Sequence, residues 1–264
     1  MLSAVTKMLE TGGRHRRAFH RLALVYGVFL AQVDSTVAFA QTLFPVQTQQ
    51  KLDPAKPLAL TPHDRNQRVL NSTAFFVDDS GHMLTVRHAV ENCARIVVTK
   101  EQHRIIARIV AQSPRYDLAL LKVPKTLGLS AVFPRGVGPS NNDMVFAGGY
   151  STLPGLQAGG GVLANARVTS SLGGSEAGHL AIDSPVTFGA SGAPVLDKNG
   201  LVQGIVSRRT MVNRVLAVGA AEAKSFLVSN NVRIDEDDRP QLSGSASRAH
   251  RAASVSALVT CLQN

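Results

Sequence analysis

The chain has 264 residues, of which 44% are hydrophobic and 17% are charged, a balance typical of a folded globular protein. Its formal net charge of +10 would suit binding to nucleic acid. After residue 40, however, no basic stretch is interleaved with aromatic side chains, so the sequence argues against a nucleic-acid partner. Its 22 glycines are enough to supply many turns between short strands.

The first 40 residues have the pattern of a secretory signal peptide. Four arginines lie between residues 14 and 21, an apolar run follows at 22–33, and small residues in an A-x-A pattern end at Ala40. The apolar run has about 12 residues, which is short for a bilayer span. We therefore expect cleavage near Ala40, export, and no stable membrane span in the mature form, with an uncleaved anchor as the alternative. Because residues 1–40 hold five Lys/Arg and two Asp/Glu, the mature chain would carry +7.

The next part of the chain divides into an arm and two groups of strands. Residues 41–65 are rich in Gln, Pro and Thr, and we expect them to form an extended N-terminal arm. Short runs of Val, Ile and Leu then recur, with turns every 8 to 12 residues or so, a spacing typical of an all-β sandwich or barrel. The first group occupies about 66–130 and the second about 135–220. Turn residues at 78–81 and 197–200 predict hairpins.

The last part of the chain predicts one clear helix and a tail. The helical pattern covers about residues 220–230, with Phe226 and Leu227 on its inner side. Residues 231–264 form the tail, which contains an acidic run at 235–238, a linker rich in Ser, Ala and Arg, and the closing run SVSALVTCL. This closing run alternates enough to be a strand that docks on the first barrel.

The stretch TFGASGAP, residues 187–194, places Ser191 among small residues. A serine hydroxyl is a poor nucleophile at neutral pH, so it needs a base to accept its proton and an acid group to orient that base. A tetrahedral intermediate also needs backbone N–H donors for its oxyanion. Small neighbours would let the N–H groups of Gly189 and Ser191 point the same way. The alternative is a serine in an ordinary tight turn.

Two further residues could complete such a site. His88, in MLTVRHAV, is suited to be the base, and Asp117, in RYDLALLKV, is suited to orient it. Each of them alone is compatible with a structural role, His88 as a packed side chain and Asp117 as a surface charge. Their joint occurrence with Ser191 predicts a Ser-His-Asp triad.

These residues carry a family resemblance. The stretches GHMLTVRHAV, YDLALLKV and GASGAPVLDKNG resemble the signature blocks of trypsin-like (chymotrypsin-fold) serine proteases, in that family's order of His, Asp and Ser. The spacings, 29 residues from His88 to Asp117 and 74 from Asp117 to Ser191, resemble the compact bacterial HtrA/Deg branch. The resemblance covers about residues 70–228, without PDZ domains. It implies two six-stranded β-barrels within residues 66–230, with the triad at their interface and a helix at the C-terminal end.

The resemblance implies a serine endopeptidase that acts on proteins or peptides through an acyl-enzyme, in the periplasm or secreted. It implies no cofactor, and the histidines lack metal-ligand spacing, so no metal is expected. The oligomeric state stays open. A catalytically inactive protease-fold binding module is the alternative, since Arg87, Ala190 and Ala193 depart from the family pattern. The family order also argues against an esterase of the α/β-hydrolase type.

The family pattern also places a specificity pocket. Pro185 lies where trypsin has its acidic residue, so nothing there would neutralise a substrate Lys or Arg. We expect cleavage after small or medium apolar residues, with an acidic preference set by Arg208 and Arg209 as the alternative. The candidate substrate-binding residues are Pro185, Val186, Thr187, Phe188, Ser207, Arg208 and Arg209.

The chain has two cysteines, Cys93 and Cys261. The predicted signal peptide implies an oxidising compartment, where paired cysteines are usually bridged. We expect a disulfide that fixes the tail to the domain. Two buried, unbridged thiols are the alternative.

Overall fold

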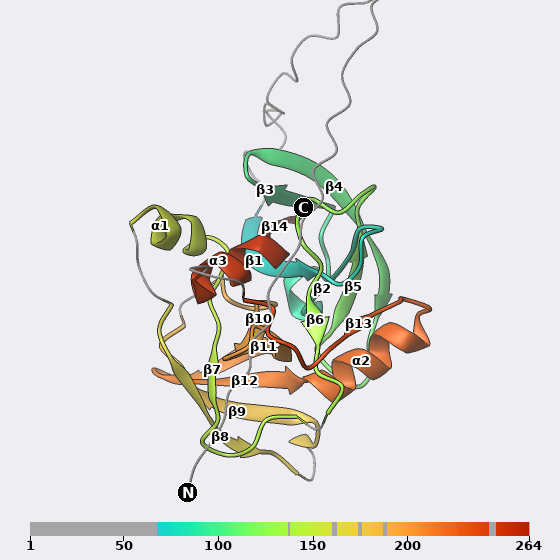
Figure 1. The fold of residues 1–264 in the computed structure, drawn as a ribbon. Coiled ribbons are helices and arrows are strands. Elements are labelled where there is room, and N and C mark those ends of the chain that lie inside the picture. Colours follow the sequence, from blue (N-terminus) through green and yellow to red (C-terminus); the bar gives the residue numbers. More distant parts are fainter. Residues whose placement is uncertain are drawn as a thin grey trace, which may run out of the picture. The chain divides into compact units, whose positions relative to one another are not determined.

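The computed structural model describes residues 68–136, 138–159, 163–173, 176–186, 189–242 and 247–263. The predicted signal peptide and the arm at 41–65 lie outside these residues. The described part forms two closed antiparallel β-barrels of six strands each (Figure 1), which confirms the predicted double-barrel fold. Within the described residues, none of the helices has the length and apolar character needed to cross a bilayer.

The first barrel has the strand order β1-β14-β3-β4-β5-β2. Its turn between β1 and β2 is a tight hairpin, as the sequence predicts, because Asp78 Oδ1 accepts hydrogen bonds from the N–H groups of Ser80 and His82. Gly81 completes the turn with φ +97°. The strands are β1 (Arg68–Phe76), β2 (His82–Thr85), β3 (Arg95–Lys100), β4 (His103–Gln112), β5 (Ala119–Lys122) and β14 (Ser256–Gln263).

The second barrel has the strand order β10-β11-β12-β9-β8-β7. Its strands are β7 (Met144–Phe146), β8 (Ala166–Ser171), β9 (His179–Asp183), β10 (Pro194–Asp197), β11 (Val202–Met211) and β12 (Arg214–Gly219). Between the barrels, β6 (Val132–Phe133) pairs in parallel with β13 (Asp235–Glu236) of the tail. This pairing joins the segment that links the two barrels to the segment that follows the last strand of the second barrel.

Apolar side chains fill both barrels. The second barrel contains a smaller cluster, mostly of valines and alanines, that includes Val168, Ile182 and Val195. The larger cluster around Phe75 and Phe76 fills the first barrel and continues onto helix α2 (Ala220–Ser229). The predicted inner side of α2 is confirmed, since Phe226 and Leu227 are both buried.

The tail contains a helix that the sequence analysis missed. Helix α3 (Arg248–Val255) occupies part of the stretch that we expected to be a linker, and Ser247 caps it by accepting a hydrogen bond from the N–H of His250. Its alanines are buried, and the ammonium group of Lys100 donates to the carbonyls of Ala253 and Ser256 near its end. Helix α1 (Leu153–Ala158), which begins at a Leu-Pro pair, was also not predicted. Alanine-rich sequence and proline at the first turn both favour these helices locally.

Strand β14 is inserted between β1 and β3, where Arg68–Phe75 pairs with one edge of β14 and Arg95–Thr99 with the other (Figure 1). Cys261 on this strand is fully buried and joined by a disulfide to Cys93, which precedes β3. The Cα atoms of the two cysteines lie 5.3 Å apart, within the usual range for a bridge. The bridge therefore fixes the tail strand to the loop that follows His88.

We predict that the disulfide stabilises the folded protein strongly, because it closes a loop with a sequence separation of 168 residues. The chain-entropy argument gives an upper value of roughly 5 kcal/mol. Replacing both cysteines by serine should lower the free energy of unfolding, measured in urea, by about 2–5 kcal/mol. Thiol titration of the denatured, unreduced protein should detect no free thiol. Two free thiols per chain would contradict the bridge, and a disulfide between two chains would reassign it to a dimer.

Candidate active site

His88 lies shortly after β2, in the 3₁₀ turn η2 (Arg87–Ala89). Its ring nitrogen Nδ1 is 2.7 Å from Oδ2 of Asp117, and its backbone N–H donates to Oδ1 of the same carboxylate at 3.1 Å. Asp117 therefore holds both the ring and the backbone of His88. With Nδ1–H as the donor, Nε2 is left as the basic nitrogen of the neutral imidazole.

Asp117 is held in a compact turn between β4 and β5. The Ser113 hydroxyl accepts the N–H groups of Arg115 and Tyr116, and the N–H of Ser113 donates to the carbonyl of Leu118. The guanidinium of Arg87 donates to the carbonyl of Ser113 at 2.9 Å. Arg87 departs from the family pattern, and here it ties the turn that carries His88 to the turn that carries Asp117.

The contact between His88 and Asp117 changes the pKa of both groups. Burial opposes ionisation of Asp117, but the hydrogen bonds from His88 and Ser207 outweigh it and lower the pKa of Asp117 to about 2. The hydrogen bond to Asp117 raises the pKa of His88 above its usual 6.5, against the opposing effect of burial. An imidazolium at His88 would therefore be stabilised by a carboxylate that stays ionised over the physiological range.

Ser191 lies in the turn before β10. The residues around it are small for two different structural reasons, one for the glycines and one for the alanines. Gly189 and Gly192 have φ of +87° and +84°, a conformation that favours glycine. A Cβ on Gly192 would lie 2.0 Å from the carbonyl oxygen of Thr73, so any side chain is excluded there. Ala190 and Ala193 are buried in the core of the second barrel. Small residues therefore surround Ser191 because this backbone turn packs directly against β1.

The Ser191 hydroxyl donates to the carbonyl oxygen of Ser207 at 3.2 Å. No hydrogen bond joins Ser191 to His88 within the described residues. Ser207, which the sequence analysis placed only in the pocket wall, also donates from its own hydroxyl to Oδ2 of Asp117 at 2.6 Å. This contact joins the second barrel to the carboxylate of the first barrel, and its 90-residue separation leaves no local signal in the sequence.

A cavity of about 300 Å³ collects most of the predicted residues. His88 and Ser191 both line it, and Asp117 lies behind His88. Val186 lines this cavity, whereas Pro185 is exposed and is not part of the lining. Thr187 and Phe188 lie outside the described residues. The full lining consists of His88, Val186, Gly189, Ala190, Ser191, Val206, Ser207, Arg208, Arg209 and Val215.

Gly189 and Ser191, whose backbone N–H groups are the predicted oxyanion donors, both line this cavity. In the part of the chain that the structure describes, neither N–H has an acceptor in the protein. Donors without an acceptor at the wall of a cavity are available to an oxygen atom of a bound molecule.

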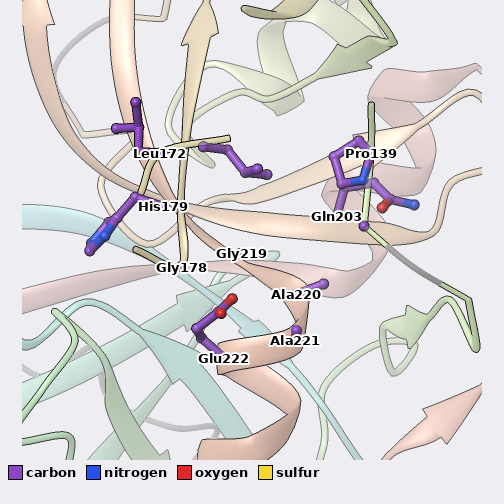
Figure 2. A pocket seen from close by; sticks show the side chains of 11 residues that line it. Pro139, Leu172, Gly178, His179, Gln203, Gly219, Ala220, Ala221 and Glu222 are labelled. Carbon is purple, nitrogen blue, oxygen red and sulfur yellow. The ribbon is translucent and has the colours of Figure 1, made fainter. Parts of the chain in front are cut away.

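A second cavity, of about 250 Å³, lies at the start of α2. Figure 2 shows Glu222 of the first turn of α2 pointing toward Gly178 and Gly219, with Gln203 and Pro139 on the opposite side. None of the three candidate triad residues lines it. Among the described residues, no group of three or more His, Cys, Asp and Glu side chains is placed to hold a metal ion.

Comparison with known proteins finds a matching family model and related sequences. The family model described as trypsin-like peptidase domain matches residues 72–205. A protein of Sinorhizobium fredii, named uncharacterized protein y4bJ, is 32% identical over 203 residues, which are 72% of this chain and 32% of y4bJ. The periplasmic serine endoprotease DegP of Escherichia coli K12 is 26% identical over 143 residues, 52% of this chain and 29% of DegP. The chain thus spans about a third of the length of these curated relatives.

Solved structures are similar in fold. The crystal structure of the serine endoprotease from Yersinia pestis superposes with a TM-score of 0.52 at 20% identity, and the match covers 61% of this chain and 62% of that chain. The structure titled HtrA-type protease AlgW with decapeptide gives a TM-score of 0.52 at 19% identity, covering 61% of this chain and 51% of that chain. Both likenesses support the double-barrel fold.

We predict that Asp117 makes folding stability depend on pH in the acid range. Its folded pKa of about 2 lies below the ordinary 3.8, so its contribution is present above pH 3.8 and is lost as pH falls through 2. Between pH 4 and pH 2 the parent should lose about 2 kcal/mol more unfolding free energy than Asp117→Asn. Urea unfolding at several pH values measures the difference. Equal losses in the two proteins would contradict the prediction.

Proposed function

This chain belongs to the trypsin-like peptidase family, and we propose that it is a serine endopeptidase whose catalytic residues are Ser191, His88 and Asp117. The proposal is carried by the cavity that His88, paired with Asp117, shares with Ser191. Among the described residues, the N–H groups of Gly189 and Ser191 at this cavity have no acceptor. This is the set of groups that acyl transfer to a serine requires.

In the proposed mechanism, Nε2 of His88 takes the proton of the Ser191 hydroxyl as Oγ attacks the peptide carbonyl. The carbonyl oxygen becomes an oxyanion that accepts hydrogen bonds from the N–H groups of Gly189 and Ser191. His88 then gives its proton to the leaving amine, which leaves an acyl-enzyme at Ser191. A water, deprotonated by His88, hydrolyses this ester and restores the enzyme. Asp117 stays ionised and orients His88 throughout, in keeping with its low pKa.

The proposed reaction requires the Ser191 hydroxyl to leave the carbonyl of Ser207 and turn toward His88. A neutral hydrogen bond contributes about 1 kcal/mol net, so this rotation is a small part of any catalytic barrier. Catalytic hydrogen bonds are often long or misaligned without substrate. The resting contact at 3.2 Å is therefore compatible with an active enzyme.

We propose that the protein is exported. The name of DegP places that relative in the periplasm. A disulfide between Cys93 and Cys261 supports an oxidising compartment for this chain as well. Protein or peptide substrates would then be met outside the cytosol.

The walls of the cavity support a preference for small or medium apolar residues. Val186, Val206 and Val215 give it an apolar surface. The guanidinium of Arg208 is paired with Glu176 at 3.0 Å. The guanidinium of Arg209 donates to the carbonyls of Met211 and Val212. Because both guanidinium groups already have partners in the protein, an acidic substrate side chain would have to displace one of these contacts to bind them.

We predict that Ser191→Ala abolishes proteolysis. If the triad acts as a unit, removing the nucleophile should lower turnover by on the order of 10⁶. Casein hydrolysis measures this loss, and Ser229→Ala, at a hydroxyl on α2 bonded to the Phe226 carbonyl, is the matched control. A peptidyl phosphonate should label the parent and not Ser191→Ala. Casein cleavage by Ser191→Ala at the parent rate refutes the assignment, and an unlabelled parent favours the inactive binding module.

We predict that a peptide library is cleaved mainly after Ala, Val and residues of similar size. Arg208→Gln should leave this profile unchanged, because the Arg208 guanidinium is already paired with Glu176. Mass-spectrometric mapping of the cleaved bonds gives the profile. An acidic preference that disappears in Arg209→Gln would assign selection to that guanidinium instead. A profile dominated by Lys or Arg contradicts both readings.

A further inference from the structure

Thr73, in the middle of β1, contacts the turn that carries Ser191 at two points. Its backbone N–H donates to the carbonyl of Ser191 at 2.9 Å, and its hydroxyl donates to the carbonyl of Gly189 at 2.8 Å. The side chain of Thr73 is fully buried. One residue of the first barrel therefore binds the carbonyls of two residues of the second barrel, which are separated in sequence by Ala190.

The direction of the Thr73 hydroxyl is fixed by a third contact. The N–H of Tyr150 donates to Oγ1 of Thr73 at 2.9 Å. A backbone N–H can only donate, so Oγ1 must use a lone pair there. Its single proton is then left for the carbonyl of Gly189. The polarity of this bond follows from the chemistry of the groups.

Thr73 is itself held in place. Its carbonyl accepts the hydroxyl of Thr85, on β2, at 2.7 Å. That carbonyl oxygen lies so close to Gly192 that a Cβ there would be 2.0 Å away. The backbone of the Ser191 turn thus packs against a residue whose hydrogen-bonding groups all have partners.

The two carbonyls that Thr73 holds flank the peptide bond between Ala190 and Ser191. The N–H of Ser191 belongs to that peptide, and it is one of the two donors assigned to the oxyanion. By holding the peptides on either side, Thr73 fixes the two ends of this peptide, the Cα atoms of Ala190 and Ser191. Its rotation between these ends is set by its own carbonyl, since Ala190 accepts the N–H of Ala193 at 2.8 Å. The position and direction of the Ser191 N–H therefore depend on Thr73 together with this local bond.

We propose that Thr73 is a positioning residue that aims the Ser191 N–H at the oxyanion, and this role rests on the proposed function. The oxyanion exists only in the transition state and the tetrahedral intermediate. Losing the Thr73 hydroxyl should therefore lower kcat and leave KM nearly unchanged. A contact that only joined the barrels would lower stability and leave both constants of the folded enzyme alone.

The experiment compares Thr73→Val, which keeps the shape and removes the hydroxyl, with Thr73→Ser, which keeps the hydroxyl. With a peptide cleaved by the parent, Thr73→Val should lower kcat by on the order of 10- to 100-fold, since the donor is misaimed and not deleted. KM should stay within about threefold, and Thr73→Ser should restore kcat to within about threefold. A peptidyl boronic acid, whose adduct on Ser191 is tetrahedral, should lose affinity in parallel with kcat.

Thr169→Val is the matched control, because it removes a threonine hydroxyl that donates to a carbonyl within the second barrel, at Ala181. It should keep the parent kcat. Should Thr73→Val not fold, Thr73→Ala leaves space for a water and is measured instead. Parent kcat and boronate affinity in a folded variant without the hydroxyl overturn the proposal, as does a loss that Thr73→Ser does not restore. A parent that neither cleaves peptides nor reacts with a phosphonate overturns the proposed function, and this role with it.

Discussion

Closure of the first barrel by the tail strand β14 is the constraint on which the site depends. An antiparallel sheet with an open edge exposes unpaired N–H and C=O groups, and a closed barrel removes both edges. Here β14 supplies the last strand by pairing with β1 on one side and β3 on the other. Strand β1 carries Thr73, and the disulfide from β14 reaches Cys93, five residues beyond His88. The tail strand thus holds two of the elements that the first barrel contributes to the site, β1 and the segment that follows His88.

The candidate site is formed where hydrogen bonds cross between the barrels. Asp117 and His88 come from the first barrel and Ser191 from the second, and Ser207 reaches across to the carboxylate of Asp117. Thr73, in the first barrel, donates hydrogen bonds to the second barrel, at the carbonyls of Gly189 and Ser191. These bonds are buried or half-buried, where leaving a partner unsatisfied costs about 1–3 kcal/mol, so a shift between the barrels would disrupt several of them together.

The sequence locates some of these parts and misses others for identifiable reasons. The double barrel and the candidate residues His88, Asp117 and Ser191 follow from short stretches with the right residue types in the right order. The role of Thr73 does not, because its contacts span 116 residues and depend on how two barrels pack. Helix α3 was missed since its small residues resemble a linker until Lys100 and the barrel provide a surface to bury them. Pro185 is exposed and lies outside the lining of the cavity, which family position alone does not indicate.

Ser207 explains where the hydroxyl of Ser191 rests. Strand β11 has a register shift between Val206 and Arg208, so the ladder with β12 is interrupted at Ser207. A bulge leaves its extra residue unpaired, and the carbonyl of Ser207 therefore accepts the Ser191 hydroxyl. A peptide that lies along β11 would compete for that same carbonyl with its own N–H. In the proposed reaction, a peptide bound in this way frees the Ser191 hydroxyl to turn toward His88.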